Sequence, residues 1–547
     1  MRIRIAAAWA AALLALSPVE AAMQQPANGS PPAMTANQWR DDLKFMASDM
    51  QKRHANLYHH VSREDFERAV TDLDRQIPNL PRNRIIVGMM RIAAMVGDGH
   101  TRVEPRKDPA FGFPSLPVKF YLFDDGLYVR AARPEQRDLL GARVEAIGGI
   151  AIDEAVRRVS ELASRDNAMG PKVYAPLFLA MPDILEAVGL SNSRETASLT
   201  LSHNGRRWTV TVPAGAIDPP WPPDTDISLV TPAGWIDANP ARPPMWLQAP
   251  LDYHRLVELP ERHALYAQVN MVADVAGETL GQFGDKILAK ASATNPQAII
   301  LDLRLAQGGN GDLRTDLVRD LIKAEDADTR LYVLTARGTF SASQFILDDL
   351  DRLTGAVFIG EPASSSPTDY GDGYKSQMPN SGISVRTAIK YWQSGQDMRP
   401  WIPTDLAPGY RFADYVEGRD PALDAALGFS PDQKLDERLF KQAATDATAI
   451  SRTADDPLYR YADVETIGWR TALRLLRAKQ QNAALALARW TAGRFPKSSD
   501  AATVRGMVAD AAGLRDEARE AAATAIRLDP NNRNAQSLLG RLNAKPK

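Results

Sequence analysis

The spacing of apolar positions changes along the chain and predicts segments of different structure. From about residue 35 to residue 96 they recur at helical spacing, as in WRDDLKFMASDM and IIVGMMRIAAMV, which predicts amphipathic helices. From about Leu116 the pattern becomes strand-like, in runs such as VKFYLF and later in SLTLSHNGRRWTVTV. We therefore expect a helical region over residues 35–110 and a strand-containing domain over residues 115–215.

A third region, residues 263–435, alternates buried apolar runs with amphipathic segments. It follows a proline-rich stretch, residues 216–262, which we interpret as a linker. The predicted strands are HALYAQVNMV, QAIILDLRL, RLYVLTA and GAVFIG, and the predicted helices are LGQFGDKILAKA, DLRTDLVRDLI and SASQFILDDLDRL. This alternation favours an α/β layer built from crossover units.

Residues 440–547 are rich in alanine and have a helical pattern throughout. Pro496 and Pro530 lie 34 residues apart, and each follows an apolar helix end and precedes a new helix. This period resembles the tetratricopeptide repeat, whose helical pairs stack on one another and can bind a protein partner. A helical cap on the preceding domain, without repeats, remains the alternative.

The first 22 residues have the pattern of a signal peptide. Arg2 and Arg4 precede a 12-residue apolar run, Ile5 to Leu16, and small residues suit cleavage near Ala21 or Ala22. The run is shorter than the roughly 20 residues that span a bilayer. We expect a periplasmic or secreted protein without stable membrane insertion.

Composition narrows the possible functions of the 547-residue chain, which is long enough for several domains. The 65 Lys and Arg residues nearly balance the 67 Asp and Glu residues, so no basic surplus predicts a nucleic-acid partner. The chain has no cysteine, which excludes disulfides and thiol catalysis.

Ser341, in GTFSASQF, is a candidate nucleophile. It stands where a predicted strand turns into a predicted helix, and the free N–H groups of a helix N-terminus stabilise developing negative charge. The N–H of Ala342 is then a natural oxyanion donor. The alternative is that Ser341 only caps the helix, because serine is a favoured N-cap residue.

Two further stretches offer the other parts of a hydrolytic site. In DLRLAQGGNGD, Gly308 and Gly309 let backbone N–H groups approach a ligand closely, as an oxyanion hole requires. The stretch lacks the GxGxxG spacing, and the chain has no GxxxxGK[ST] motif, so no nucleotide cofactor is predicted. His100, in MVGDGHTRV, supplies a possible base, although a histidine in a solvated turn is the alternative.

Three other histidines, in RHANLYHH, do not predict a metal site. They lack the HExxH spacing and a matching carboxylate pattern, so we interpret them as surface or packing residues. They are His54, His59 and His60.

The motifs, taken in their order, resemble the carboxy-terminal-processing (tail-specific) serine peptidases, and in particular their tricorn-like branch. The resemblance covers roughly residues 35–430. The matching stretches are GDGHT, DLRLAQGG (Asp302 to Gly309), SASQ (Ser341 to Gln344), GEPASSSPTDYGD (Gly360 to Asp372) and WIPTDL.

This resemblance implies a multidomain α+β chain with an α/β crotonase-like (ClpP-like) peptidase core over residues 263–435. It implies a PDZ-like domain over residues 115–215, where an extended peptide would add to a sheet edge. The usual glycine-rich carboxylate loop is not evident before VKFYL, so a purely structural role remains as plausible. The implied activity is that of an exported serine peptidase acting on peptides or proteins, without metal or organic cofactor.

Within this family, only the tricorn-like branch has a general base and an acidic residue that can be matched to residues of this chain. The processing peptidases use a lysine 25 residues after the nucleophile, and that position is Ser366 here. Lys375 is near but out of register. The tricorn-like branch uses the upstream histidine, here His100, and an acidic residue before its P-D motif, best matched by Asp397.

Two further departures leave other functions open. Ala306 replaces the usual asparagine of the glycine turn, and Gln344 replaces the usual glutamate of the nucleophile motif. The alternatives are a catalytically degenerate scaffold that binds peptides or protein partners, and an esterase that uses the same serine.

Overall fold

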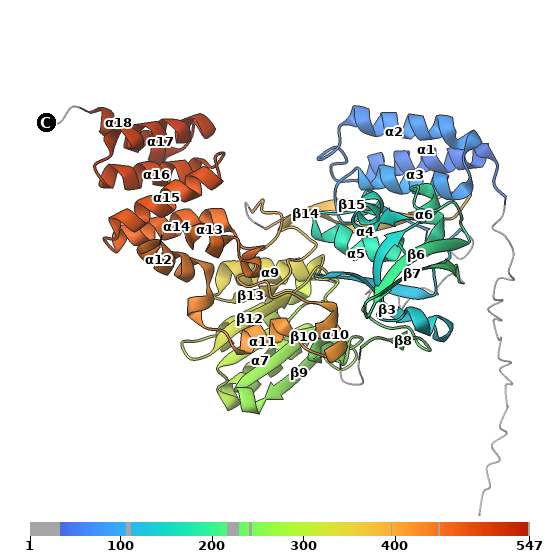
Figure 1. The fold of residues 1–547 in the computed structure, drawn as a ribbon, viewed down its shortest axis with the longest axis horizontal. Helices are drawn as coiled ribbons and strands as arrows, with labels where there is room; N and C mark the ends of the chain where they lie inside the picture. Colours follow the sequence, from blue (N-terminus) through green and yellow to red (C-terminus); the bar gives the residue numbers. More distant parts are fainter. Residues whose placement is uncertain are drawn as a thin grey trace, which may run out of the picture. The chain divides into compact units, whose positions relative to one another are not determined.

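The computed structural model describes residues 33–105, 111–215, 229–239, 243–394, 397–446 and 449–544, and residues 34–547 belong to one compact unit. The predicted signal peptide, residues 1–22, lies outside the described residues, as does part of the predicted linker. The prediction of a mixed α+β chain is confirmed, since helices alternate with three sheets (Figure 1). No helix among the described residues has the length and apolar character needed to cross a membrane.

Three helices form the N-terminal part of the described chain, and their apolar faces pack together through Leu43, Met50, Phe66 and Ile86. They are α1 (Ala36–Arg53), α2 (Arg63–Gln76) and α3 (Arg82–Ala94). The GDGHT stretch follows α3 and leads into a short strand, β1 (Arg102–Glu104).

The next sheet has the strand order β2-β3-β4-β6-β7, and its neighbours run antiparallel. Its strands are β2 (Val118–Phe123), β3 (Gly126–Ala132), β4 (Arg143–Ile147), β6 (Thr196–His203) and β7 (Arg206–Pro213), with β5 (Ile150–Ala151) on β4 and β8 (Ile236–Asp237) on β3. Three helices stand between β5 and β6: α4 (Ile152–Ser160), α5 (Met169–Phe178) and α6 (Pro182–Ala187). The PDZ-like assignment of this domain stays a prediction.

The third region forms a five-stranded sheet of order β13-β12-β11-β10-β9, in which only β9 is antiparallel to its neighbour. Its strands are β9 (His254–Leu259), β10 (Ala264–Val269), β11 (Ala298–Asp302), β12 (Arg330–Thr335) and β13 (Val357–Gly360). The crossover helices are α7 (Leu280–Thr294), α8 (Arg314–Ala324) and α9 (Ala342–Leu353). The four parallel strands and three helices are those that the apolar pattern predicts.

Both faces of this sheet are buried, which explains its continuous apolar strands. Leu265, Leu301 and Val333 on one face pack against α7, α8 and α9. Tyr266 and Ile300 on the other face belong to an apolar cluster that continues into the C-terminal helices. The cluster reaches α11 (Pro421–Leu427), α12 (Leu435–Thr445), α13 (Ala449–Ala454), α14 (Val464–Arg477), α15 (Gln481–Arg494) and α16 (Ser499–Ala511). The other C-terminal helices are α10 (Phe412–Glu417), α17 (Arg515–Leu528) and α18 (Arg533–Asn543).

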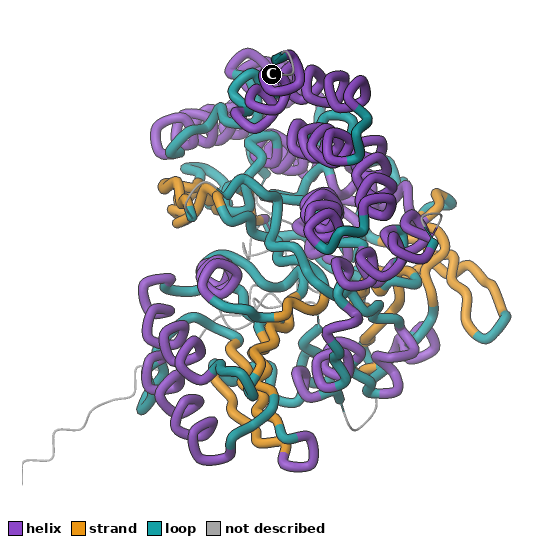
Figure 2. Tube along the Cα trace, turned by 90° about the vertical axis from the view of Figure 1, so that its left-hand side faces the viewer, coloured by secondary structure: helices purple, strands orange, loops and turns teal. Residues whose placement is uncertain are grey.

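Helices α14 to α18 pack one against the next (Figures 1 and 2). The first residues of α16 and α18, Ser499 and Arg533, are 34 residues apart, which is the spacing expected from the prolines. The assignment of these helices to the tetratricopeptide family stays a prediction, as does a partner on them.

A long hairpin that the sequence pattern does not predict joins the core to the N-terminal helices. Its strands are β14 (Thr368–Gln377) and β15 (Ser384–Gln393), and β15 pairs on its other side with β1. The carboxylate of Asp42 on α1 accepts hydrogen bonds from the N–H groups of Asn380 and Ser381 at the hairpin turn, at 2.8 and 2.9 Å. The hairpin therefore places the residues around β1 beside the core.

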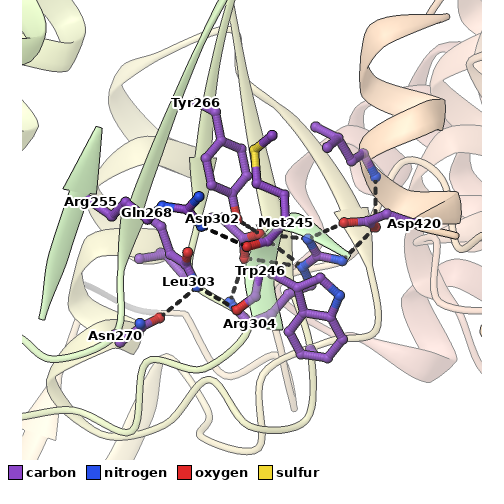
Figure 3. A network of polar contacts seen from close by, with 12 residues as sticks. Met245, Trp246, Arg255, Tyr266, Gln268, Asn270, Asp302, Leu303, Arg304 and Asp420 are labelled. Carbon is purple, nitrogen blue, oxygen red and sulfur yellow. Dashed lines mark hydrogen bonds and ion pairs between the residues drawn. The ribbon is translucent and has the colours of Figure 1, made fainter. Parts of the chain in front are cut away.

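A buried ionic network supports the end of β11, where the glycine turn begins (Figure 3). Arg304 is 6% exposed and donates to Asp302 and to Asp420, with its shortest contacts to them at 2.6 and 2.7 Å. The hydroxyl of Tyr266 donates to the same Asp302 carboxylate at 2.7 Å. The guanidinium of Arg304 also lies 4.5 Å from the ring centre of Trp246.

Candidate active site

Ser341 has a backbone conformation that serine rarely adopts. Its φ of 56° and ψ of −127° lie in a region that favours glycine, which costs about 1–3 kcal/mol. It stands at the N-cap position of α9, yet its side chain makes no capping hydrogen bond, so the alternative of a simple helix cap is wrong. Its own N–H donates to the hydroxyl of Ser365 at 2.8 Å.

The hydroxyl of Ser341 instead contacts His100. Its Oγ lies 3.1 Å from Nε2 of the imidazole, within hydrogen-bond distance. The ring of His100 also stacks on Phe340, with 4.6 Å between ring centres. Although 241 residues separate the two side chains in sequence, the pairing of β1 with β15 brings the histidine to the core.

The turn that carries His100 is shaped by Asp98. One carboxylate oxygen of Asp98 accepts from the N–H groups of His100 and Thr101, at 2.8 and 2.6 Å, and the other lies 3.0 Å from Nε2 of His54. Burial opposes ionisation of Asp98, but these hydrogen bonds hold its pKa below the ordinary value. His54 is thus a buried structural residue rather than a surface one.

The charge state of His100 suits a base. Burial, with the positive charge of Arg102, lowers the pKa of His100 to about 4, so the imidazole is neutral near pH 7 and can accept a proton. Its Nδ1 is buried and has no hydrogen-bond partner among the described residues. The backbone of Tyr370 lies beside the ring and raises the pKa of His100, against the effect of burial.

The glycine turn lies against Ser341. Gly308 and Gly309 have φ values of 113° and 134°, which only glycine adopts readily. A Cβ on Gly308 would lie 2.7 Å from Cβ of Ser341, and one on Gly309 would lie 2.2 Å from the carbonyl oxygen of Val272. No larger residue fits at either position.

The N–H groups of the glycine turn and of Ala342 are available to a ligand. Within the described chain, the N–H groups of Gly308, Gly309 and Ala342 donate to no other group. Gly309 and Ala342 line a small cavity of about 90 Å³ together with Ser341 and His100. These two amides are therefore the best placed oxyanion donors.

The remaining residues that the sequence singles out lie elsewhere. The carboxylate of Asp397 is bound by Arg399 at 2.6 Å, which holds its pKa below the ordinary value against the effect of burial, and no described contact joins it to His100. Lys375 is exposed on β14 and does not line either cavity at Ser341. The hydroxyl of Ser366 donates to the carbonyl of Pro400 at 2.8 Å.

Ala306 and Gln344, the two residues that differ from the family motifs, both make hydrogen bonds within the core. The carbonyl of Ala306 accepts from the N–H of Phe340 at 3.0 Å, which ties the glycine turn to the nucleophile loop. The amide of Gln344 donates to the carboxylate of Asp348 at 2.7 Å.

Two acidic residues that the sequence motifs do not indicate lie beside the histidine. Asp166 precedes α5, and Asp369 lies on β14. Each offers a carboxylate oxygen within 4.8 Å of the other and of a ring nitrogen of His100. These are the only three described side chains grouped closely enough to hold a metal ion.

A larger cavity of about 540 Å³ opens beside Ser341 and His100. Its wall on the side of α5 and α6 is apolar, and the side chains that form it are Leu162, Val173, Leu177, Phe178, Met181 and Ile184. The site thus combines a polar centre with space for a bulky apolar group.

No protein-family model matches the chain, and no curated protein matches it. Solved structures do resemble it. A mature CPAF bound to lactacystin is 12% identical, with a TM-score of 0.50 over 73% of this chain and 99% of CPAF. A serine-to-alanine variant of CPAF is 11% identical, with a TM-score of 0.52 over 72% of this chain and 96% of its own.

The photosystem II D1 C-terminal processing protease is 13% identical over 70% of this chain and 98% of its own, with a TM-score of 0.33. The likeness to CPAF shows a shared fold, since identities this low carry no activity from one protein to another. This likeness supports the multidomain α+β fold that the motifs predict.

Proposed function

We propose that the protein is a serine peptidase whose acyl-enzyme forms on Ser341 with His100 as the general base. The observation that carries this proposal is the 3.1 Å contact between Ser341 Oγ and His100 Nε2. Ser341 makes no capping hydrogen bond with its side chain, and its backbone is strained. Such strain is common at functional sites. The likeness of the fold to processing peptidases also supports the proposal.

The reaction begins when Ser341 Oγ attacks the carbonyl carbon and Nε2 of His100 takes the hydroxyl proton. The carbonyl oxygen becomes an oxyanion, which accepts hydrogen bonds from the N–H groups of Gly309 and Ala342. Each such donor is typically worth about 2.7–4 kcal/mol. His100 then gives its proton to the leaving amine as the C–N bond breaks, and a water molecule hydrolyses the ester by the same steps.

Labelling with a fluorophosphonate tests the nucleophile. We expect wild type to react and Ser341→Ala not to react, because the phosphorus atom bonds to an activated serine oxygen. Ser343→Ala is the matched control, since this serine lies in the same motif and its buried hydroxyl has no described partner. If wild type stays unlabelled, or Ser341→Ala takes up equal label, the proposal is wrong and a binding scaffold becomes the better hypothesis.

The apolar cavity indicates the substrate preference. We expect cleavage beside bulky apolar side chains, and Leu177→Glu should lower kcat/KM for such peptides about 10- to 100-fold. The measurement is mass spectrometry of a cleaved peptide mixture, followed by kinetics on the best sequence. Met507→Glu, at a residue 37% exposed on α16, is the control. An equal loss for peptides with small polar residues would contradict this preference.

The same cavity favours one alternative, an esterase that binds an apolar acyl chain. Rates on p-nitrophenyl esters of rising chain length, compared with rates on peptides, separate the two. Cleavage of esters without any cleavage of peptides would assign the esterase activity.

A further inference from the structure

Asp166 and Asp369 form a buried acidic pair that the proposed reaction does not yet use. Asp369 is 5% exposed, and its Oδ1 has no hydrogen-bond partner within the described chain. Asp166 is partly exposed as a residue, but its Oδ2 is buried and also lacks a partner there. Buried carboxyl groups without partners are costly, so such a pair calls for an explanation.

The pair is joined to both members of the dyad. Oδ1 of Asp166 accepts from the N–H of Gly99, the residue before His100, at 2.7 Å. The hydroxyl of Ser365, which accepts the N–H of Ser341, is the polar group that lowers the pKa of both carboxyls against the larger effect of burial. The pair thus contacts the elements that hold the nucleophile and the base.

Asp369 is the better placed of the two acids to act on the imidazole. It lines the small cavity together with His100 and Ser341, whereas Asp166 does not. His100 Nε2 faces Ser341, so the ring nitrogen left for an acid is Nδ1, which is buried without a partner. The carboxylate that the family resemblance suggested, Asp397, is bound by Arg399.

We propose that Asp369 is the positioning residue that orients His100 through Nδ1, and that Asp166 holds the proton that the two acids share. This inference rests on the proposed function of Ser341 and His100. In the working state Asp369 is ionised and accepts the Nδ1–H, which fixes the tautomer whose Nε2 is free to take the serine proton. The imidazolium that forms is stabilised by the carboxylate, and Asp166 keeps its proton throughout.

The surroundings of the pair explain why one proton stays on it. The acidic groups that face it are Asp98 of the GDGHT turn, Asp348 on α9 and Asp372 on β14. The cations at the site already pair with other acids, namely Arg102 and Arg386 with Glu104 and Lys390 with Asp372. Burial, and then neighbouring negative charge, raises the pKa of both Asp166 and Asp369 well above the ordinary value.

The pH dependence follows from these shifts. The pKa of His100 is about 4, so its protonation does not limit the rate near neutral pH. Because Asp369 must lose its proton, the labelling rate should rise with pH well above pH 4. Because Asp166 keeps its proton, asparagine replaces one neutral group by another, so Asp369 should ionise, and the rate should rise, at about the wild-type pH.

The experiment measures fluorophosphonate labelling rates between pH 5 and pH 9 for wild type, Asp369→Asn, Asp166→Asn and Asp328→Asn. We expect Asp369→Asn to label roughly 10³- to 10⁴-fold more slowly, because asparagine favours the wrong tautomer. Asp166→Asn should keep most of the rate at pH 9 and leave the rise within about half a pH unit of wild type, whereas a larger move to lower pH would mean that Asp166 carries charge and would overturn its role. Asp328, exposed and outside both cavities at Ser341, is the control and should leave the profile unchanged.

Thermal melting separates positioning from a structural role. A carboxyl with a raised pKa contributes stability below its ordinary pKa and loses it as pH rises through the raised value. Asp369→Asn should therefore melt at or above the wild-type Tm at pH 8, while a structural role predicts a lower Tm.

Labelling of Asp369→Asn within about threefold of wild type would mean that the backbone of Tyr370 suffices, and would overturn the inference while the proposed function stands. Labelling that is lost in EDTA and restored by Zn²⁺ would make the three side chains metal ligands and would also overturn it. Absence of label on wild type removes both the inference and the proposed function.

Discussion

Replacement of His100 by alanine is expected to slow labelling of Ser341 by roughly 10⁴- to 10⁶-fold, within the range of losses when a general base is removed from a serine hydrolase. The reason is geometric, because Nε2 is the only described base within hydrogen-bond distance of Ser341 Oγ. The measurement is the rate of fluorophosphonate labelling at a pH where the wild-type rate no longer rises with pH. A loss smaller than about tenfold would remove His100 as the base.

Two controls make this result specific. His203→Ala, at an exposed histidine at the end of β6, should label at the wild-type rate. Lys375→Ala should do the same, whereas a strong effect there would restore the lysine alternative. Addition of imidazole above pH 7 should recover part of the His100→Ala rate, since the vacated position opens into the cavity of about 540 Å³.

The fold of His100→Ala should remain nearly intact. The ring loses its stacking on Phe340, but the variant also loses a buried nitrogen without a hydrogen-bond partner. These effects oppose each other, and the free energy of unfolding should fall by less than about 2 kcal/mol. Activity lost with little change in Tm marks a residue that acts in the chemistry.

The sequence predicts those parts of the structure that depend on a local pattern of residues, namely the apolar strands of the core and the glycine turn. Strands β10 to β13 are buried on both faces and appear as continuous apolar runs, as in AIILD and RLYVLT. Gly308 and Gly309 are required by close approach of the backbone, so they too leave a local signal. Ser341 and His100 sit in short motifs whose order along the chain indicates a hydrolase.

The residues that sequence reasoning missed depend on tertiary structure. Asp166 lies in a loop without any motif, and Asp369 lies on β14, whose polar and glycine-rich sequence does not predict a strand. The assignment of Asp397 followed the family order of motifs, but Arg399, two residues later, binds its carboxylate. The hairpin of β14 and β15, paired with β1, brings Asp369 to the histidine.

Replacement of Arg304 by methionine is expected to lower the free energy of unfolding by about 3–5 kcal/mol, the usual cost of removing one partner of a buried ion pair. The guanidinium holds Asp302 and Asp420, which are 0% and 7% exposed, and the variant leaves both carboxylates buried without it. Chemical denaturation at pH 7 measures the change. Arg157→Met, at an exposed pair with Glu154, should leave stability nearly unchanged, because solvent screens exposed ion pairs.

The loss of stability should come from the two buried carboxylates that no longer have a cation beside them, rather than from lost packing. A triple variant distinguishes these two causes. Arg304→Met combined with Asp302→Asn and Asp420→Asn should recover more than half of the lost stability, because asparagine keeps an acceptor for Tyr266 and for the N-terminus of α11. Arg304→Lys should recover less, since one ammonium cannot bind two carboxylates as the planar guanidinium does. If the triple variant is no more stable than Arg304→Met, the packing of Arg304 on Trp246 carries the stability instead.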